Sequence, residues 1–262
     1  MLTVYSQNVW NHLPSSFRNN LIRTLIDDFD ADLCAFQECG PDTSRKGEAS
    51  LPSLMHNDYD EVCPEYADKN YTPIFYKRNK FSVTDSGYFL FDGMNDCDSK
   101  SVTWAVFLDK ITGKSFGFVS THFWWMHESE QDNLQRLENV RQLKEICDIL
   151  VEKYNISLIV CGDINSGVNK PQGEGAYQAM VKNGFSDIRY TAGETTDAYT
   201  HHEYPEMNER GTYEKGQMPT GNLDYIFTYG KKKAKARKFD VMTTQDALNS
   251  SDHCPLVAWF EK

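Results

Sequence analysis

The chain has 262 residues, of which 40% are hydrophobic and 13% aromatic; this composition excludes a disordered chain and allows a substantial core. Its formal net charge of −11 has the wrong sign for a protein that holds bulk nucleic acid by neutralising phosphates, so nonspecific nucleic-acid binding is disfavoured. No apolar stretch approaches the length of a transmembrane helix, so stable membrane insertion is not expected.

The length and the cysteines indicate how the chain is organised. Sandwich and barrel folds often reach this size as one domain, and no linker or repeat marks a boundary. We therefore expect a single domain over residues 1–262, acting as a monomer. Residues 1–5 have the pattern of a strand rather than of a signal peptide, and the seven cysteines include no CxxC pair. Reduced thiols and a cytoplasmic location are expected.

Strands predominate along the chain. Apolar residues repeat at helical spacing over residues 17–30, 134–151 and 176–181. Strand-like runs cover residues 2–9, 32–37, 73–76, 81–91, 102–108, 115–122, 157–161, 223–228, 239–243 and 256–260. Many strands with few helices predict two packed sheets with helices outside, an α/β sandwich.

Three other segments lack this periodicity. Residues 40–70 and 193–220 are polar, so we expect long surface loops near the rim of the sheets. The basic stretch 231–238 lies between two strand-like runs, and we interpret it as a solvated hairpin without a function.

Polar residues follow four of the apolar runs, which suggests that they share one site. These segments are Gln37-Glu38, Thr121-His122, Gly162-Asp163-Ile164-Asn165 and Ser251-Asp252-His253. Hydrolysis of a phosphate ester needs an activated water, neutralisation of the phosphoryl oxygens and help for the leaving oxygen. Carboxylates, carboxamides and imidazoles supply all three.

An ordered series of six short segments carries a resemblance to a known family. The segments are Ser6-Gln7-Asn8-Val9-Trp10, Phe36-Gln37-Glu38, Val119-Ser120-Thr121-His122, Gly162-Asp163-Ile164-Asn165, Leu223-Asp224-Tyr225-Ile226-Phe227 and Ser251-Asp252-His253. Together they resemble the endonuclease/exonuclease/phosphatase superfamily, whose fold is like that of DNase I, over essentially the whole chain. The resemblance implies a four-layered α/β sandwich, with two packed, mostly antiparallel sheets flanked by helices. It also implies divalent-metal-dependent hydrolysis of phosphate mono- or diesters.

The expected metal is Mg²⁺, with Mn²⁺ as an alternative, because a hard cation takes oxygen ligands. Glu38 is the best candidate ligand. Asn8 offers a neutral carboxamide oxygen that would position Glu38 or the metal, and Asp252 is placed on the metal side by the resemblance.

Five residues are expected to act on the phosphoryl group. Asp163 would be the general base for the attacking water, and Asn165 would donate to a phosphoryl oxygen. A protonated His253 would stabilise developing charge, with Asp224 as its carboxylate partner by the resemblance. The sequence alone leaves the roles of Asp224 and Asp252 exchangeable. The resemblance places His122 on the opposite side of the phosphate.

Departures from the family pattern bear on the substrate. Where many members carry Leu-Asp, this chain has Phe123-Trp124-Trp125-Met126, so Trp124 and Trp125 would either stack on the substrate or pack beneath a helix. Arg136 resembles a substrate-binding arginine of the following helix, although Arg141 competes for that assignment.

A second departure is Ser101, which stands where many relatives have an arginine, with Lys100 adjacent. The acidic chain favours a small-molecule, lipid or nucleotide phosphoester as substrate. A nuclease and a non-catalytic binding module remain alternatives. His12, His56, His127 and the loop pair His201-His202 match no motif, and weak metal binding by the loop pair is a minor alternative.

Overall fold

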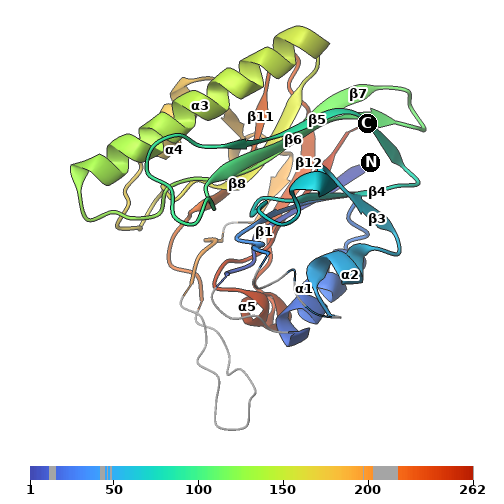
Figure 1. Cartoon of the computed structure of the whole chain (residues 1–262), viewed down its shortest axis with the longest axis horizontal. Helices are drawn as coiled ribbons and strands as arrows, with labels where there is room; N and C mark the ends of the chain where they lie inside the picture. The colour runs from blue at the N-terminus through green and yellow to red at the C-terminus, as the bar shows by residue number, and fades with distance from the viewer. Residues whose placement is uncertain are drawn as a thin grey trace.

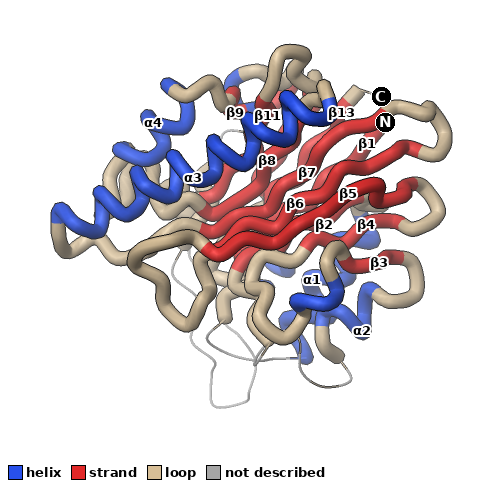
Figure 2. The backbone as a smooth tube through the Cα atoms, turned by 45° about the horizontal axis from the view of Figure 1, so that its top comes forward, coloured by secondary structure: helices blue, strands red, loops and turns tan. Residues whose placement is uncertain are grey.

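The computed structural model describes residues 1–11, 16–41, 45, 47, 49–196, 198–202 and 218–261. Two β-sheets pack face to face, and helices cover both outer faces (Figures 1 and 2). The strands are β1 (Leu2–Asn8), β2 (Leu33–Gln37), β3 (Tyr59–Glu61), β4 (Ile74–Lys77), β5 (Phe81–Leu90), β6 (Ser101–Asp109), β7 (Ser115–His122), β8 (Leu158–Asp163), β9 (Ser186–Asp187), β10 (Glu194–Thr195), β11 (Asp224–Tyr229), β12 (Ala236–Val241) and β13 (Leu256–Phe260). The helices are α1 (Ser16–Asp28), α2 (Leu51–Met55), α3 (Glu130–Tyr154), α4 (Gly175–Lys182) and α5 (Gln245–Ser250), with 3₁₀ turns η1 (Pro64–Tyr66) and η2 (Ile188–Tyr190). His12 lies outside the described residues.

The sheets are mixed but mostly antiparallel. The seven-stranded sheet has the order β10-β12-β13-β1-β2-β4-β3, and the six-stranded sheet has the order β5-β6-β7-β8-β11-β9. Parallel pairing occurs only between β1 and β2, β10 and β12, and β7 and β8 among the strands described. The sequence-based prediction of two packed, mostly antiparallel sheets is confirmed.

Apolar side chains fill three layers between the elements. Val4, Phe107 and Phe118 belong to the core between the two sheets. A second core lies under α3 and α4, and a third lies under α1. β1 is buried along its whole length, and this includes its polar residues Thr3, Ser6, Gln7 and Asn8. The three cores separate four layers, which are two sheets and the helices on each outer face, so the structure is the expected four-layered α/β sandwich.

The long helix α3 illustrates how local sequence sets the boundaries of an element. At its start, Ser129 and Asp132 form a capping box, in which each side chain accepts a backbone N–H of the other residue. The helix ends at Asn155, which adopts a left-handed conformation with φ 52°. No helix within the described ranges is long and apolar enough to cross a bilayer.

Two expectations about surface loops were wrong for the residues described. Residues 40–70 contain α2, β3 and the buried Asn70, and residues 200 and 202 are also buried. These short elements depend on partners distant in sequence, because β3 pairs with β4 and the amide of Cys254 donates to the carbonyl of Thr200. Local periodicity carries no signal for such pairing.

Candidate active site

The register of the six-stranded sheet places three site residues in one row. His122 ends β7 directly opposite Asp163, which ends β8, and Asp163 is opposite Asp224, the first residue of β11. Paired residues of neighbouring strands point to the same face of a sheet. A polar row therefore forms at one edge of the sandwich, because the ends of the parallel strands β7 and β8 meet the start of the antiparallel strand β11 in register.

The other sheet contributes Asn8 from the end of β1 and Glu38 from just after β2. The Asn8 carboxamide nitrogen donates to Glu38 Oε1 at 3.1 Å and to Asp163 Oδ2 at 2.9 Å, so it joins the two sheets. Glu38 has φ 55°, which is uncommon for a residue other than glycine, and its Oε2 accepts the amide of Asn11 at 3.0 Å. This turn directs the carboxylate back over the end of the strands.

Asp163 is almost fully buried at the centre of the site. Its Oδ1 accepts the backbone amide of Asn165 at 2.8 Å, while Oδ2 lies 3.6 Å from His122 Nε2 and 3.9 Å from His253 Nε2. Burial, together with the negative charge of Asp224, raises the pKa of Asp163 to about 7. The carboxylate is therefore poised to gain or lose a proton near neutral pH.

His253 is fixed by a carboxylate from the opposite sheet. Its Nδ1 donates to Asp224 Oδ2 at 2.8 Å, and the hydroxyl of Thr200 donates to the same oxygen at 2.7 Å. Burial disfavours the charged imidazole, but Asp224 and then Asp252 outweigh it and raise the pKa of His253 to about 10. The His253 ring is therefore protonated, and its Nε2 faces Asp163.

His122 has the opposite electrostatic character. Burial is the main cause that holds its pKa well below the usual value, and Lys100 and His253 add to the effect. The Asn165 carboxamide nitrogen lies 3.1 Å from both His122 Nε2 and the carbonyl oxygen of Phe123. A carbonyl oxygen can only accept, so the Asn165 amide must point its nitrogen toward Phe123 and His122. His122 Nε2 is then the acceptor of the second N–H, and the ring is neutral.

The role expected of Asn165 differs in the structure, and Asn8 takes one of its two expected roles. Asn165 uses both amide protons on His122 and Phe123, so in this arrangement it positions His122 and offers no free N–H to a phosphate. The Asn8 oxygen accepts the amide of Trp10 at 2.9 Å. Turning the Asn8 amide would lose that bond and face an oxygen toward two carboxylates, so Asn8 positions Glu38 rather than ligating a metal.

Glu38 and Asp252 are the candidate oxygen ligands that remain on the open side of the site. Their side chains are 27% and 16% exposed. Burial raises the pKa of Asp252 to about 6, with the charge of His253 opposing this rise and that of Glu38 adding to it. Repulsion between two carboxylates is relieved by a cation held between them. The donor chemistry therefore fits a hard divalent ion.

Two of the three expected substrate-binding side chains are buried elsewhere. Trp124 is 6% exposed, and its indole N–H donates to Asp132 at 2.7 Å, so it packs beneath the start of α3. Arg136 is also buried and donates to the carbonyls of Met126 and Gln172, so it holds the loop that follows β7. Trp124 thus takes the second of its two expected roles, and the substrate-binding role expected of Arg136 is corrected, because its guanidinium is buried against backbone carbonyls.

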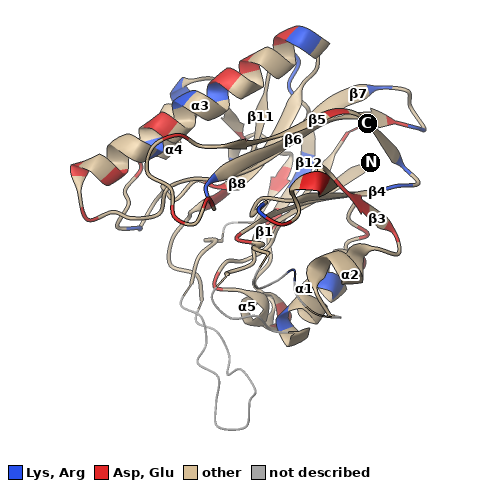
Figure 3. Ribbon diagram, viewed as in Figure 1, with Lys and Arg blue, Asp and Glu red and all other residues tan. Residues whose placement is uncertain are grey.

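Trp125 remains on the rim. It is 46% exposed, and its indole N–H donates to Asp96 at 2.8 Å. The competing arginine, Arg141, lies on the exposed side of α3 and pairs with Glu138 and Glu145. Figure 3 shows this alternation of acidic and basic side chains along α3, which leaves no continuous basic face on the helix.

The position of the missing arginine is filled by neutral groups. The Ser101 hydroxyl lies 2.8 Å from that of Thr72, in a buried cluster with Thr103. Lys100 is buried, and its ammonium group pairs with Asp96 at 3.2 Å and donates to Ser99. Its ammonium group is thus paired within the protein and is not directed to a substrate.

Sequence reasoning missed three groups that support the site. Thr200 orients Asp224, and Gln7 donates to the carbonyl of His253 at 3.1 Å. The hydroxyl of Ser251 donates to the carbonyl of Asn8 at 2.7 Å. Gln7 and Ser251 were visible inside the motifs as polar residues within buried strand ends, but Thr200 had no signal in its polar segment.

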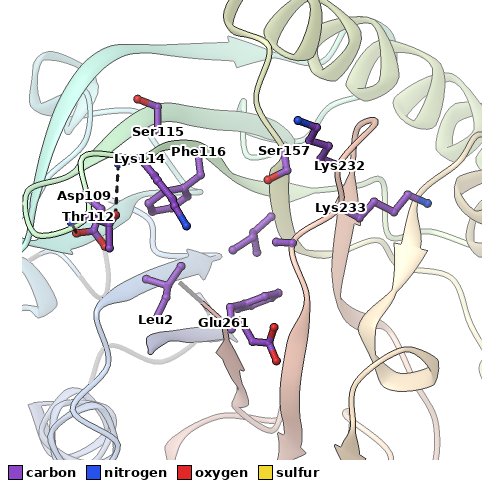
Figure 4. A pocket seen from close by; sticks show the side chains of 13 residues that line it. Leu2, Asp109, Thr112, Lys114, Ser115, Phe116, Ser157, Lys232, Lys233 and Glu261 are labelled. Atoms are coloured by element: carbon purple, nitrogen blue, oxygen red, sulfur yellow. Dashed lines mark hydrogen bonds between the residues drawn. The ribbon is translucent and has the colours of Figure 1, made fainter.

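The basic stretch 231–238 lies at the opposite end of the sandwich from the site. There a crevice of about 220 Å³ is lined by the starts of β1 and β7, the end of β13 and the lysines Lys114, Lys232 and Lys233 (Figure 4). Lys235 and Arg237 pair with Glu261. The stretch therefore takes no part in the candidate site.

The two sheets, their outer helices and a polar site at the edge of the sandwich define a DNase I-like fold. No protein-family model matches the sequence, and no curated protein is matched by sequence. Solved structures do match at the level of the fold.

Three of these structures span nearly the whole chain. A mannosyl-6-phosphatase from Bacteroides thetaiotaomicron is 20% identical, with 100% of both chains covered and a TM-score of 0.74. An endonuclease/exonuclease/phosphatase from Bacteroides vulgatus is 23% identical, with 99% of this chain and 98% of that chain covered and a TM-score of 0.72. D. rerio TDP2, complexed with single-strand DNA product, is 14% identical, with 100% and 99% covered and a TM-score of 0.69. The expected DNase I-like fold is confirmed.

Proposed function

We propose that this chain is one catalytic domain that hydrolyses phosphoesters with a divalent metal ion. The observation that carries the proposal is the surroundings of Asp163 Oδ2. Asn8 donates to this oxygen at 2.9 Å, and the protonated His253 lies 3.9 Å from it. A buried carboxylate beside an imidazolium and two further acidic oxygens suits the activation of water next to a phosphoryl group.

Asp163 acts as the general base. A pKa near 7 allows the carboxylate to accept a proton from water at neutral pH, where a base of much lower pKa would be weak. The Asn165 amide and the Asn8 carboxamide hold its two oxygens, so the free lone pair has a fixed direction. This order reduces the entropic cost of reaching the reacting geometry.

His253 stabilises the charge that develops on the phosphoryl oxygens. Asp224 accepts from Nδ1, which leaves the Nε2 proton directed into the site. His122 supports the reaction as a neutral group on the other side of Asp163. Glu38 and Asp252 would hold Mg²⁺ or Mn²⁺, which when bound supplies positive charge to the phosphoryl oxygens.

The substrate is a small-molecule phosphoester in this proposal. The exposed rim offers one indole, Trp125, and α3 carries balanced charges rather than a basic face. A mannosyl-6-phosphatase is among the structures that match over the whole chain, which makes sugar phosphates the first compounds to assay. The acidic net charge agrees with a substrate that is not duplex DNA.

The test is turnover of a substrate panel with Mg²⁺ or Mn²⁺. The panel contains mannose 6-phosphate, p-nitrophenyl phosphate, bis-p-nitrophenyl phosphate, sphingomyelin and single-stranded and duplex DNA. We expect hydrolysis of a small phosphoester that EDTA abolishes and added metal restores. Asp163→Asn should lower kcat by at least about 100-fold because the general base is lost.

Asp68→Asn serves as the matched control, since that carboxylate is exposed and outside the site. It should retain full activity. Preferential cleavage of DNA would instead support the nuclease alternative. Absence of any turnover by a folded, metal-loaded protein would support a binding module.

A further inference from the structure

The loop histidine His201 is built into the wall of the site. The amides of Thr200 and His201 donate to the carbonyl of Gly221 at 3.0 Å, and the amide of Cys254 donates to the carbonyl of Thr200 at 2.7 Å. His201 also forms an isolated β-bridge with His253. Backbone pairing on both sides therefore fixes where its side chain points.

The ring of His201 stands against the ring of His253. Their centroids are 4.6 Å apart, and the planes meet at 82°. His201 Nε2 lies 3.9 Å from Asp252 Oδ2, and ligand atoms of His201, Asp252 and His253 all lie within 4.8 Å of one another. The side chain is 26% exposed. A molecule that contacts His253 from the open side therefore also comes within reach of the His201 ring.

Lys170 determines which nitrogen of His201 carries the proton. Its ammonium group lies 2.5 Å from His201 Nδ1, and an ammonium group can only donate. Nδ1 is therefore the acceptor, and the ring is a neutral tautomer with its proton on Nε2. A Cβ on Gly221 would lie 2.8 Å from Cε of Lys170, so the absence of a side chain there gives the lysine stem its place.

The charge of the site creates a need for this group. Asp163, Asp224 and Asp252 lie within 4.0 Å of the His253 ring, Glu38 lies 3.8 Å from His122, and a phosphate monoester brings up to two more negative charges. Of the buried cations nearby, Lys100 is paired with Asp96, and Arg18 donates to the backbone carbonyls of Trp10 and Ser250. Lys170 brings a further positive charge toward the cluster, and the ring of His201 connects it to the opening.

We propose that His201 is a further catalytic residue, whose Nε2–H donates to the phosphoryl group beside His253 while Lys170 supplies positive charge behind the ring. This inference rests on the proposed function and narrows its substrate. Two donors within 4.8 Å can reach separate oxygens of one phosphoryl group at ordinary hydrogen-bond lengths. The metal that Glu38 and Asp252 would hold takes a further terminal oxygen, so three are needed in all. A monoester offers three terminal oxygens and a diester only two, so the site favours a phosphate monoester.

Kinetics of four variants test the proposal. His201→Phe keeps a ring against His253 but removes the donor, and His201→Gln restores an N–H. Lys170→Met keeps the stem over Gly221 without the charge, and Lys170→Arg keeps the charge. For p-nitrophenyl phosphate, we expect kcat/KM to fall about 10- to 100-fold in His201→Phe, because a lost transition-state donor has effects of this order. The decrease in kcat/KM should be smaller in Lys170→Met. His201→Gln should have a higher kcat/KM than His201→Phe, and Lys170→Arg a higher kcat/KM than Lys170→Met.

Discrimination between substrates is the second readout. Against bis-p-nitrophenyl phosphate the same His201→Phe change should lower kcat/KM by less than about threefold, so the preference for the monoester shrinks. Circular dichroism establishes that each variant is folded. Equal losses on monoester and diester, or unchanged kcat/KM in folded His201→Phe and Lys170→Met, would overturn the inference while the proposed function stands.

Binding of inorganic phosphate separates the two hypotheses without turnover. With Mg²⁺ present, isothermal titration calorimetry should show weaker phosphate binding in His201→Phe and in Lys170→Met than in the wild type, by about fivefold or more. If the wild type binds phosphate but hydrolyses nothing, the proposed function fails and this comparison still tests the contact. Equal phosphate affinities in the wild type and both variants would refute the proposed contact of His201 with the phosphoryl group.

Discussion

Asp224 is one carboxylate that controls the protonation of two neighbours. It accepts from His253 Nδ1 at 2.8 Å and helps to raise the pKa of that ring to about 10. After burial, its charge is also the main cause that raises the pKa of Asp163 to about 7. The base and the charged imidazole are therefore coupled through one residue.

This coupling predicts the pH dependence of kcat/KM. Asp163 must be ionised to act as base, so activity rises as pH passes about 7, and His253 must be protonated, so activity falls as pH passes about 10. Asp224→Asn removes the charge that raises both pKa values. Both limbs of the profile should therefore move to lower pH, alongside a lower maximum.

Thr200→Val is the control for that profile, because it removes the hydroxyl that donates to Asp224 but leaves the carboxylate charge. Its two limbs should stay closer to those of the wild type. A profile of Asp224→Asn in which the ascending limb stays in place would show that Asp224 does not act on Asp163.

At the scale of single residues, the sequence indicated which residues would share a site, but not which hydrogen bonds their side chains would make. The types and order of Asn8, Asp163 and His253 were enough to expect a shared site. The Asn165 amide is committed to His122 and Phe123, and the Trp124 indole is committed to Asp132. Such commitments depend on side-chain directions across different elements, which no local pattern contains.

Gly162 shows how an element positions the site. It precedes Asp163 in β8, and a Cβ at this position would lie 2.5 Å from the backbone oxygen of Thr121 in β7. The neighbouring pair in this register is His122 and Asp163. The close approach of the two strands therefore sets the distance between the imidazole and the carboxylate.

Gly162→Ala should push β7 and β8 apart beside the site. Because displacement of catalytic groups by about 1 Å has a large effect on rate, we expect kcat/KM to fall by at least about tenfold in a folded protein. Gly117→Ala is the matched control in the same strand pair. Its Cβ would meet the Leu158 side chain far from the site, so stability should fall while activity per folded molecule is retained. Equal activity of both variants would contradict the prediction.

At the level of elements, long apolar patterns were predictable and short pairings were not. The sequence predicted β7 and β13 with the bounds observed, because each strand contains a run of apolar residues and most of its residues are buried. It missed α5, which has six residues, and the extended segment around Thr200. These are stabilised by distant partners, so their own composition gives little indication of their structure.

The whole molecule depends on the core shared by the two sheets. Phe118 lies in this core with no exposed surface, in a central strand and away from the site end of β7. The outer helices pack against separate cores. Loss of packing between the sheets should therefore weaken both halves of the sandwich together.

Phe118→Ala should lower the free energy of unfolding by about 3–5 kcal/mol, the usual range for a buried phenylalanine. Urea denaturation followed by both tryptophan fluorescence and circular dichroism measures it. Phe17→Ala, at a position that is 49% exposed on α1, should change the free energy by less than about 0.5 kcal/mol. A loss under 1 kcal/mol in Phe118→Ala would show that the sheets do not depend on this contact.

The pairing of β1 with β13 has a consequence for the timing of folding during synthesis. The paired residues, from Leu2 with Phe260 to Ser6 with Leu256, are at least 250 positions apart. While the ribosome makes the intervening chain, one edge of β1 has no neighbour and can pair with other nascent chains. His253 also arrives only with the segment that precedes β13. The candidate site is therefore completed late, and a chaperone that shields the unpaired strand should increase the yield of folded protein.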